Sequence, residues 1–167
     1  MTKITILITC FLSFYSSVAQ LSKVKAGFIY HFTKYIEYPE SKRYGDFVIA
    51  IVGKTDVTSF LEVLALSKRV GTQNIVIKEF KTIEDVTKCH ILYLPSSESK
   101  SFNLAVIKGV YFNSLLIVEK SGLGKMGACI NFIVDNNKAK FEINTNAIKK
   151  SNLKIDNKLI SLGLKIN

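Results

Sequence analysis

The sequence predicts a single α/β domain with a mostly parallel sheet flanked by helices and a C-terminal β-hairpin. Three observations support this fold class. Continuous apolar runs, such as residues 47–52 and 90–94, are typical of buried parallel strands. Amphipathic segments with helical spacing separate these runs. Near the C-terminus, Asp135-Asn-Asn137 is a hairpin signal that adds an antiparallel pair.

The composition agrees with one globular domain. The chain has 167 residues, of which 48% are hydrophobic and 22% charged, and it has only two prolines and nine glycines. This balance excludes a disordered chain. Three cysteines and the lack of a heptad repeat exclude a disulfide-dense scaffold and a coiled coil.

The first nineteen residues have the pattern of a secretory signal peptide. Lys3 is followed by an apolar run over residues 4–15 and by Ser17-Val-Ala19. The run is shorter than the roughly 20 residues that span a bilayer. We therefore expect cleavage after Ala19, export to the periplasm without stable membrane insertion, and a mature domain of residues 20–167. The alternative is a buried first strand or helix.

The elements of the mature chain follow in order. A helix is predicted over residues 21–38, with Ser22 as its N-cap and Pro39 at its end. The predicted strands are residues 47–52, 74–80, 90–94, 115–119, 128–134 and 138–144. The predicted later helices are residues 55–68, 99–110, 147–150 and 158–164.

The first helix carries aromatic residues on the side that should face water. Tyr30, Lys34 and Tyr38 follow at i, i+4 and i+8, and His31 lies at the edge of this side. Exposed aromatic side chains often anchor protein interfaces. These four residues are therefore predicted to bind a partner. The alternative is that a later segment of the same domain covers them.

The net charge of +10 comes mostly from lysine, because only Arg43 and Arg69 among the 23 basic residues are arginines. Base and phosphate recognition favours the guanidinium group, so this imbalance argues against specific nucleic-acid binding. A lysine-rich solvated surface is one interpretation of the charge. Attraction to anionic partners is the other.

No catalytic, metal or cofactor site is predicted. His31 and His90 are the two histidines, and neither has the spacing of a hydrolase or a metal site. Gly122-Leu-Gly-Lys-Met-Gly127 has dinucleotide-binding spacing, but that motif needs a helix after it and residues 128–134 are predicted as a strand. These glycines are therefore interpreted as turn residues.

Ser96 and Ser97 lie between a predicted parallel strand and the next helix, at the edge where ligands bind in open α/β sheets. Together with Asn131 they are predicted to line a ligand crevice. A plain helix cap, with Ser97 or Glu98 serving the first turn, is the alternative for this loop.

Two cysteines remain after cleavage, Cys89 and Cys129. An oxidising compartment permits a structural disulfide between them. Each one also lies beside a strand-like run, where a small buried thiol fits equally well.

Three stretches of the sequence resemble the YfiR-like family of periplasmic proteins. The first is residues 25–39, an aromatic-rich segment that ends in Glu37-Tyr-Pro39. The second is residues 89–98, a strand that ends in serines. The third is a C-terminal signature over residues 127–134, 140–144 and 153–159. His31 and Ala128 depart from the family pattern, where asparagine and a second glycine are usual.

The resemblance implies a single Rossmann-like α/β domain, often dimeric, that acts as a regulatory protein and has no catalytic activity. The best-known member binds the periplasmic part of a membrane diguanylate cyclase and keeps it inactive, which links the envelope to cyclic-di-GMP and biofilm formation. That member has two disulfides, and the two cysteines here cannot reproduce them. The leading hypothesis is a regulator that binds a membrane signalling protein of the diguanylate cyclase or sensor kinase type. The rival is a small-ligand-binding module, and a hydrolase ranks third.

Overall fold

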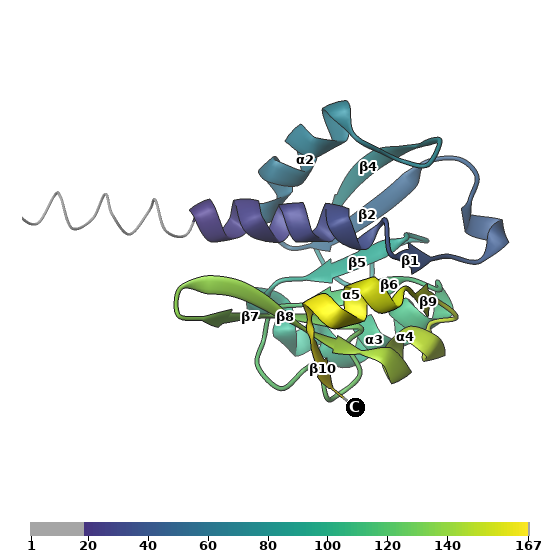
Figure 1. Cartoon of the computed structure of the whole chain (residues 1–167). Helices are drawn as coiled ribbons and strands as arrows, with labels where there is room; N and C mark the ends of the chain where they lie inside the picture. Colours follow the sequence, from purple (N-terminus) through teal and green to yellow (C-terminus); the bar gives the residue numbers. More distant parts are fainter. Residues whose placement is uncertain (1–18, 167) are drawn as a thin grey trace, which may run out of the picture.

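The computed structural model describes residues 19–166, so the predicted signal peptide lies outside the described residues except for Ala19. One α/β unit with a central twisted sheet makes up the structure (Figure 1). The chain starts at one end of the sheet with a helix over residues 19–32.

The sheet has eight strands in the spatial order β10-β8-β7-β6-β5-β2-β4-β3. Their bounds are β2 Phe47–Val52, β3 Arg69–Val70, β4 Gln73–Phe80, β5 Ile91–Leu94, β6 Leu115–Val118, β7 Ile130–Asp135, β8 Lys138–Asn144 and β10 Leu164–Ile166. The five strands from β4 to β7 are mutually parallel, and β8 pairs antiparallel with β7. Counted along the chain, this parallel core has the order 2-1-3-4-5 of flavodoxin-like doubly wound sheets.

Helices cover both faces of the sheet. The helix bounds are α2 Val57–Ser67, α3 Phe102–Tyr111, α4 Thr145–Lys150 and α5 Asn157–Leu162, and the short 3₁₀ helices are η1 Glu40–Lys42 and η2 Ser96–Ser101. The connection from β2 to β4 and the connection from β5 to β6 run in opposite directions across the sheet. Because both crossovers are right-handed, α2 and α3 lie on opposite faces.

The N-terminal helix packs on the same face as α2, since both contribute to one surface hollow lined by Lys23, Val24 and Phe60. Its aromatic side chains pack against the antiparallel end of the sheet. Phe32 lies 5.9 Å from Phe132 of β7 and 5.0 Å from Phe141 of β8, measured between ring centroids. Burial of these rings holds the helix to the sheet.

The mixed α/β fold with a mostly parallel sheet is confirmed, but the first helix is shorter than predicted. It ends at residue 32, and the backbone turns over residues 33–35. The chain then forms β1 (Ile36–Glu37), which pairs antiparallel with β9 (Lys154–Ile155). Ser22 lies inside the helix and is buried, so its prediction as an N-cap is wrong.

Three short strand pairings were not predicted: β1 with β9, β3 with β4, and β10 with β8. Segments of two or three residues are too short to show a period in sequence. Among the helices of residues 19–166, none is both long and apolar enough to span a membrane.

Candidate functional site

Three of the four residues predicted to bind a partner lie together at the end of the N-terminal helix. His31 and Lys34 are exposed, and Tyr30 is half-buried. The Lys34 Nζ lies 4.9 Å from the centroid of the Tyr30 ring, and the His31 ring lies 6.3 Å from it. We call these three residues the Tyr30 face. They combine an aromatic ring with a cation, which suits a contact surface.

Tyr38, the fourth predicted contact residue, does not belong to this face. It is 7% exposed and packs against Phe47 and His90, each 5.4 Å away between ring centroids. The helical period that would place it beside Lys34 stops at residue 32, and the extended backbone after the turn directs it into the core. Its prediction as an exposed contact residue is therefore wrong.

A largely buried ion pair holds the middle of the N-terminal helix to the sheet. The Lys25 Nζ lies 2.8 Å from Oε1 of Glu119, and the two side chains are 15% and 11% exposed. The same carboxylate oxygen accepts a hydrogen bond from the Tyr93 hydroxyl. Burial and then the Glu119 charge raise the pKa of Tyr93, so its hydroxyl stays protonated and donates. The pair anchors the helix at the carboxyl edge of β5 and β6.

This anchor lies next to the point where the order of the parallel strands reverses, between β2 and β5. Ligands of doubly wound sheets bind in the crevice at this point. Here the side chain of Glu98 lies against Gly53, where a Cβ atom would be 2.8 Å from Glu98 Cγ. A side chain of the protein itself, that of Glu98, therefore lies beside the crevice.

The three residues predicted to line a ligand crevice are not brought together. Ser96 and Ser97 are exposed after β5, whereas Asn131 is fully buried in β7, with β6 between the two strands. Asn131 Nδ2 instead donates to Glu142 Oε2 at 2.8 Å. The alternative, in which Ser97 or Glu98 caps the first turn of the helix, is also wrong. Neither η2 nor α3 has a side-chain hydrogen bond that caps its N-terminus.

The cysteines are both buried and free, so the disulfide interpretation is wrong for this structure. Cys89 precedes β5 and Cys129 precedes β7, with β6 between them. Two strand spacings separate these positions by at least ~9.6 Å. A disulfide needs Cα atoms within about 7 Å. Burial is the main cause that raises the pKa of both thiols, that of Cys129 to about 11.

His90 has a structural role, as the sequence indicated. Its Nδ1 accepts a hydrogen bond from the Val48 backbone N–H at 3.0 Å, and its Nε2 lies 2.8 Å from the Lys42 carbonyl oxygen. Burial lowers the pKa of this histidine. Residues 121–127 form turns and lead into β7, so the glycine motif is a turn, as predicted. Within residues 19–166, no three His, Cys, Asp or Glu side chains are placed to hold a metal ion.

Sequence reasoning missed the Lys25–Glu119 pair. Lys25 follows the helical pattern as an ordinary surface lysine, and nothing in the pattern shows that it faces a carboxylate 94 positions later. One signal was available, because Glu119 directly follows the fully buried strand β6 at the functional edge of a parallel sheet.

These observations define the class of the protein. It is a single-domain α/β protein of doubly wound order in which the Glu98 side chain lies against Gly53 beside the switch point. A family model described as YfiR/HmsC-like matches residues 22–163, so the chain belongs to the YfiR/HmsC-like family. A comparison with the curated proteins finds no match.

Membership of this family implies a periplasmic regulatory protein of cyclic-di-GMP signalling. The family is regulatory and not catalytic. The match covers every element from the N-terminal helix to α5, so the anchor and the Tyr30 face both belong to the family domain.

Proposed function

We propose that this protein binds the periplasmic part of a membrane signalling protein, of the diguanylate cyclase or sensor kinase type, and controls its activity. In this proposal the chain is exported after cleavage at Ala19, and it acts by surface recognition without catalysing a reaction. The contact surface is the Tyr30 face.

The observation that carries the proposal is the arrangement of the Tyr30 face. Lys34 lies over the ring of Tyr30, and His31 lies beside it, on a helix end whose other side is packed on the sheet. An aromatic side chain on a rigid element loses little entropy when it binds, and the contact with the Tyr30 ring already restrains Lys34. The net charge of +10 favours a partner with an acidic surface.

The physical mechanism is a shift of population in the partner. A membrane signalling protein that exchanges between active and inactive states is shifted toward the state that this protein binds more tightly. A hundredfold difference in affinity between the two states corresponds to about 2.7 kcal/mol of coupling. Recognition of the inactive state would lower cyclic-di-GMP production.

The test measures cellular cyclic-di-GMP in a strain that lacks the gene and is complemented with variants. The wild-type chain should lower the level, and the variant Tyr30→Ala with Lys34→Glu should leave it at the level of the deletion strain. Lys34 is exposed in the turn after the helix, and Tyr30 is half-buried at the helix end. An immunoblot of the periplasmic fraction therefore checks that the variant is exported and as abundant as the wild type.

The matched control is Tyr44→Ala with Lys149→Glu, which removes an exposed tyrosine and reverses an exposed lysine elsewhere on the protein. This control should complement as well as the wild type. Full complementation by the Tyr30 and Lys34 variant would show that the contact surface lies elsewhere. A level that does not depend on the gene at all would contradict control of a diguanylate cyclase.

A further inference from the structure

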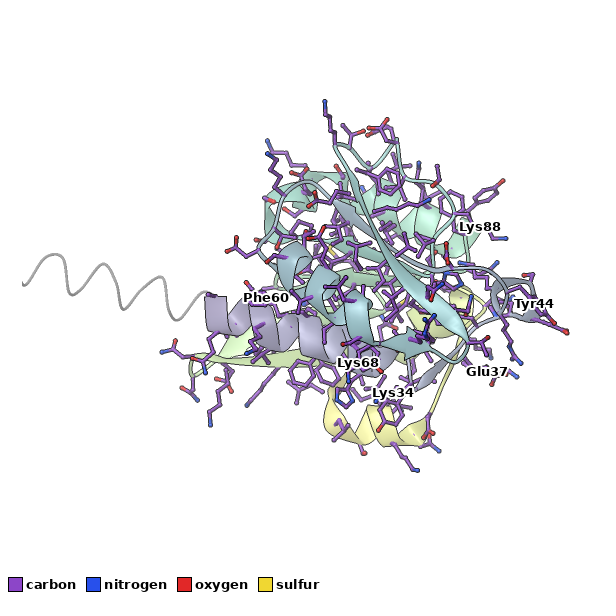
Figure 2. All side chains as sticks on the ribbon, turned by 90° about the horizontal axis from the view of Figure 1, so that it is seen from above. Lys34, Glu37, Tyr44, Phe60, Lys68 and Lys88 are labelled. Carbon is purple, nitrogen blue, oxygen red and sulfur yellow. The ribbon has the colours of Figure 1, made fainter. Side chains whose placement is uncertain are left out.

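A surface hollow lies at the amino-terminal edge of the parallel strands, away from the Tyr30 face and from the switch point. It has a volume of about 340 Å³ and is lined by Ser41, Lys42, Lys88, Tyr111, Phe112 and Asn113. Figure 2 shows Lys88 and Tyr44 at this end of the molecule, opposite the start of the N-terminal helix. The lining residues come from η1, the segment before β5 and the end of α3.

Lys42 is the unusual member of this lining. It is only 2% exposed, and within residues 19–166 its Nζ donates one hydrogen bond, to the carbonyl oxygen of Cys89. An ammonium group has three donors, so two are left without a protein acceptor. None of the lining residues is acidic, and none of the ion pairs among the described residues includes Lys42 or Lys88. A buried charge without a counter-ion is costly.

The electrostatics of the hollow agree with an unpaired cation. Burial is the main cause that lowers the pKa of Lys42 from 10.5 to about 8, and the charge of Lys88 lowers it further, although Cys89 acts in the opposite direction. Lys42 is therefore still mostly protonated at neutral pH. An anion placed between the two lysines would relieve both the burial cost and their repulsion.

The rest of the hollow suits a small anionic group. The Ser41 hydroxyl and the Asn113 amide can donate hydrogen bonds to it. Tyr111 and Phe112 give the hollow an aromatic side. Tyr111 is 79% exposed, so the hollow is open to solvent on this side.

We propose that this hollow is an oxyanion-binding site, in which a phosphate or carboxylate group pairs with Lys42 and Lys88. Either inorganic phosphate or the carboxylate of a small organic acid supplies this chemistry. The site is separate from the Tyr30 face, so it does not depend on the proposed function.

The test is an NMR titration of the wild-type protein with inorganic phosphate and, in a second arm, with succinate. Sodium chloride keeps the ionic strength constant in both arms. Saturable shifts of the Lys88 and Asn113 amide signals are expected with one of the anions, and the arm with the tighter binding identifies the source of the group. No saturable shift with either anion would overturn the proposal.

Three variants locate the binding. Lys88→Met changes an exposed residue and should weaken binding at least tenfold, and Lys42→Met should abolish it. Lys68→Met removes an exposed lysine outside the hollow and should bind like the wild type. Unchanged binding in Lys88→Met, or equal weakening in Lys68→Met, would mean an adventitious ion only and would overturn the proposal.

Discussion

The ion pair between Lys25 and Glu119 should contribute to stability far more than a surface ion pair does. The two side chains are only 15% and 11% exposed, and Glu119 also accepts a hydrogen bond from Tyr93. Replacement of Lys25 by Met leaves the carboxylate buried without its cation. Removal of one partner from a fully buried pair costs about 3–5 kcal/mol. Because Tyr93 still donates and some water reaches the site, we expect a loss of about 2–3 kcal/mol.

Urea unfolding of a double-mutant cycle measures this contribution. Lys25→Met, Glu119→Gln and the double variant are compared with the wild type at pH 7. The coupling energy between the two residues should be about 1.5–3 kcal/mol, whereas exposed pairs give about 0.2–1 kcal/mol. The exposed pair of Arg43 and Glu37, with an N–O distance of 2.7 Å, is the matched control. A Lys25–Glu119 coupling no larger than that of this control would refute the reasoning.

A second readout tests what the pair does for the fold. If it docks the N-terminal helix on the sheet, Lys25→Met should speed hydrogen exchange in residues 19–32 more than in β5 and β6. Uniformly faster exchange across the sheet would instead indicate a global loss of stability, without a special role in docking this helix.

Lys42→Met should raise the free energy of unfolding by about 1–2 kcal/mol at pH 7, because it removes an unpaired buried charge. The pKa of Lys42 is about 8 in the folded state and 10.5 in the unfolded state, so the wild type gains stability between pH 8 and pH 10.5. In urea melts, the stability difference in favour of Lys42→Met should therefore shrink over this range. A difference that grows with pH would contradict the assignment. Cys89 and Cys129 should react with a thiol reagent only on unfolding, and fast labelling of the native protein would argue against their burial. Gly27→Ala should stabilise by about 0.5–1 kcal/mol, because a Cβ atom there meets open space on a helix. Gly163→Ala should lower the free energy of unfolding by about 1–3 kcal/mol, because its Cβ would lie 2.6 Å from the Phe141 ring. Equal melting temperatures of Gly27→Ala and Gly163→Ala would contradict the packing described.

The centre of the sheet could be predicted from sequence because the strands β2, β5 and β6 are buried on both faces. Runs such as 47–52 and 115–118 are apolar without interruption, and each is followed by a glycine, proline or charged residue. The helices α2 and α3 were predicted from their spacing, although η2 precedes α3 as a separate 3₁₀ segment. Local pattern is sufficient wherever the element is long and packed on one side.

The site was predicted less well, because its contacts are not local. The position of Tyr38 depends on where the first helix ends, and that end is set by the pairing of β1 with a strand more than 100 residues later. The burial of Lys42 depends likewise on Cys89, 47 positions away. A period in the sequence identifies one side of a helix, but it does not show which distant segment covers that side.

Photo-crosslinking in the intact cell envelope tests the central claim most directly. A photoreactive phenylalanine analogue replaces His31, which is exposed on the Tyr30 face, and in a control strain it replaces Leu162, which is 67% exposed on α5. The account predicts a crosslinked product from position 31 that mass spectrometry identifies as a membrane diguanylate cyclase or sensor kinase, and no such product from position 162. A product of this kind from position 162 alone, or from neither position, would contradict recognition through the Tyr30 face.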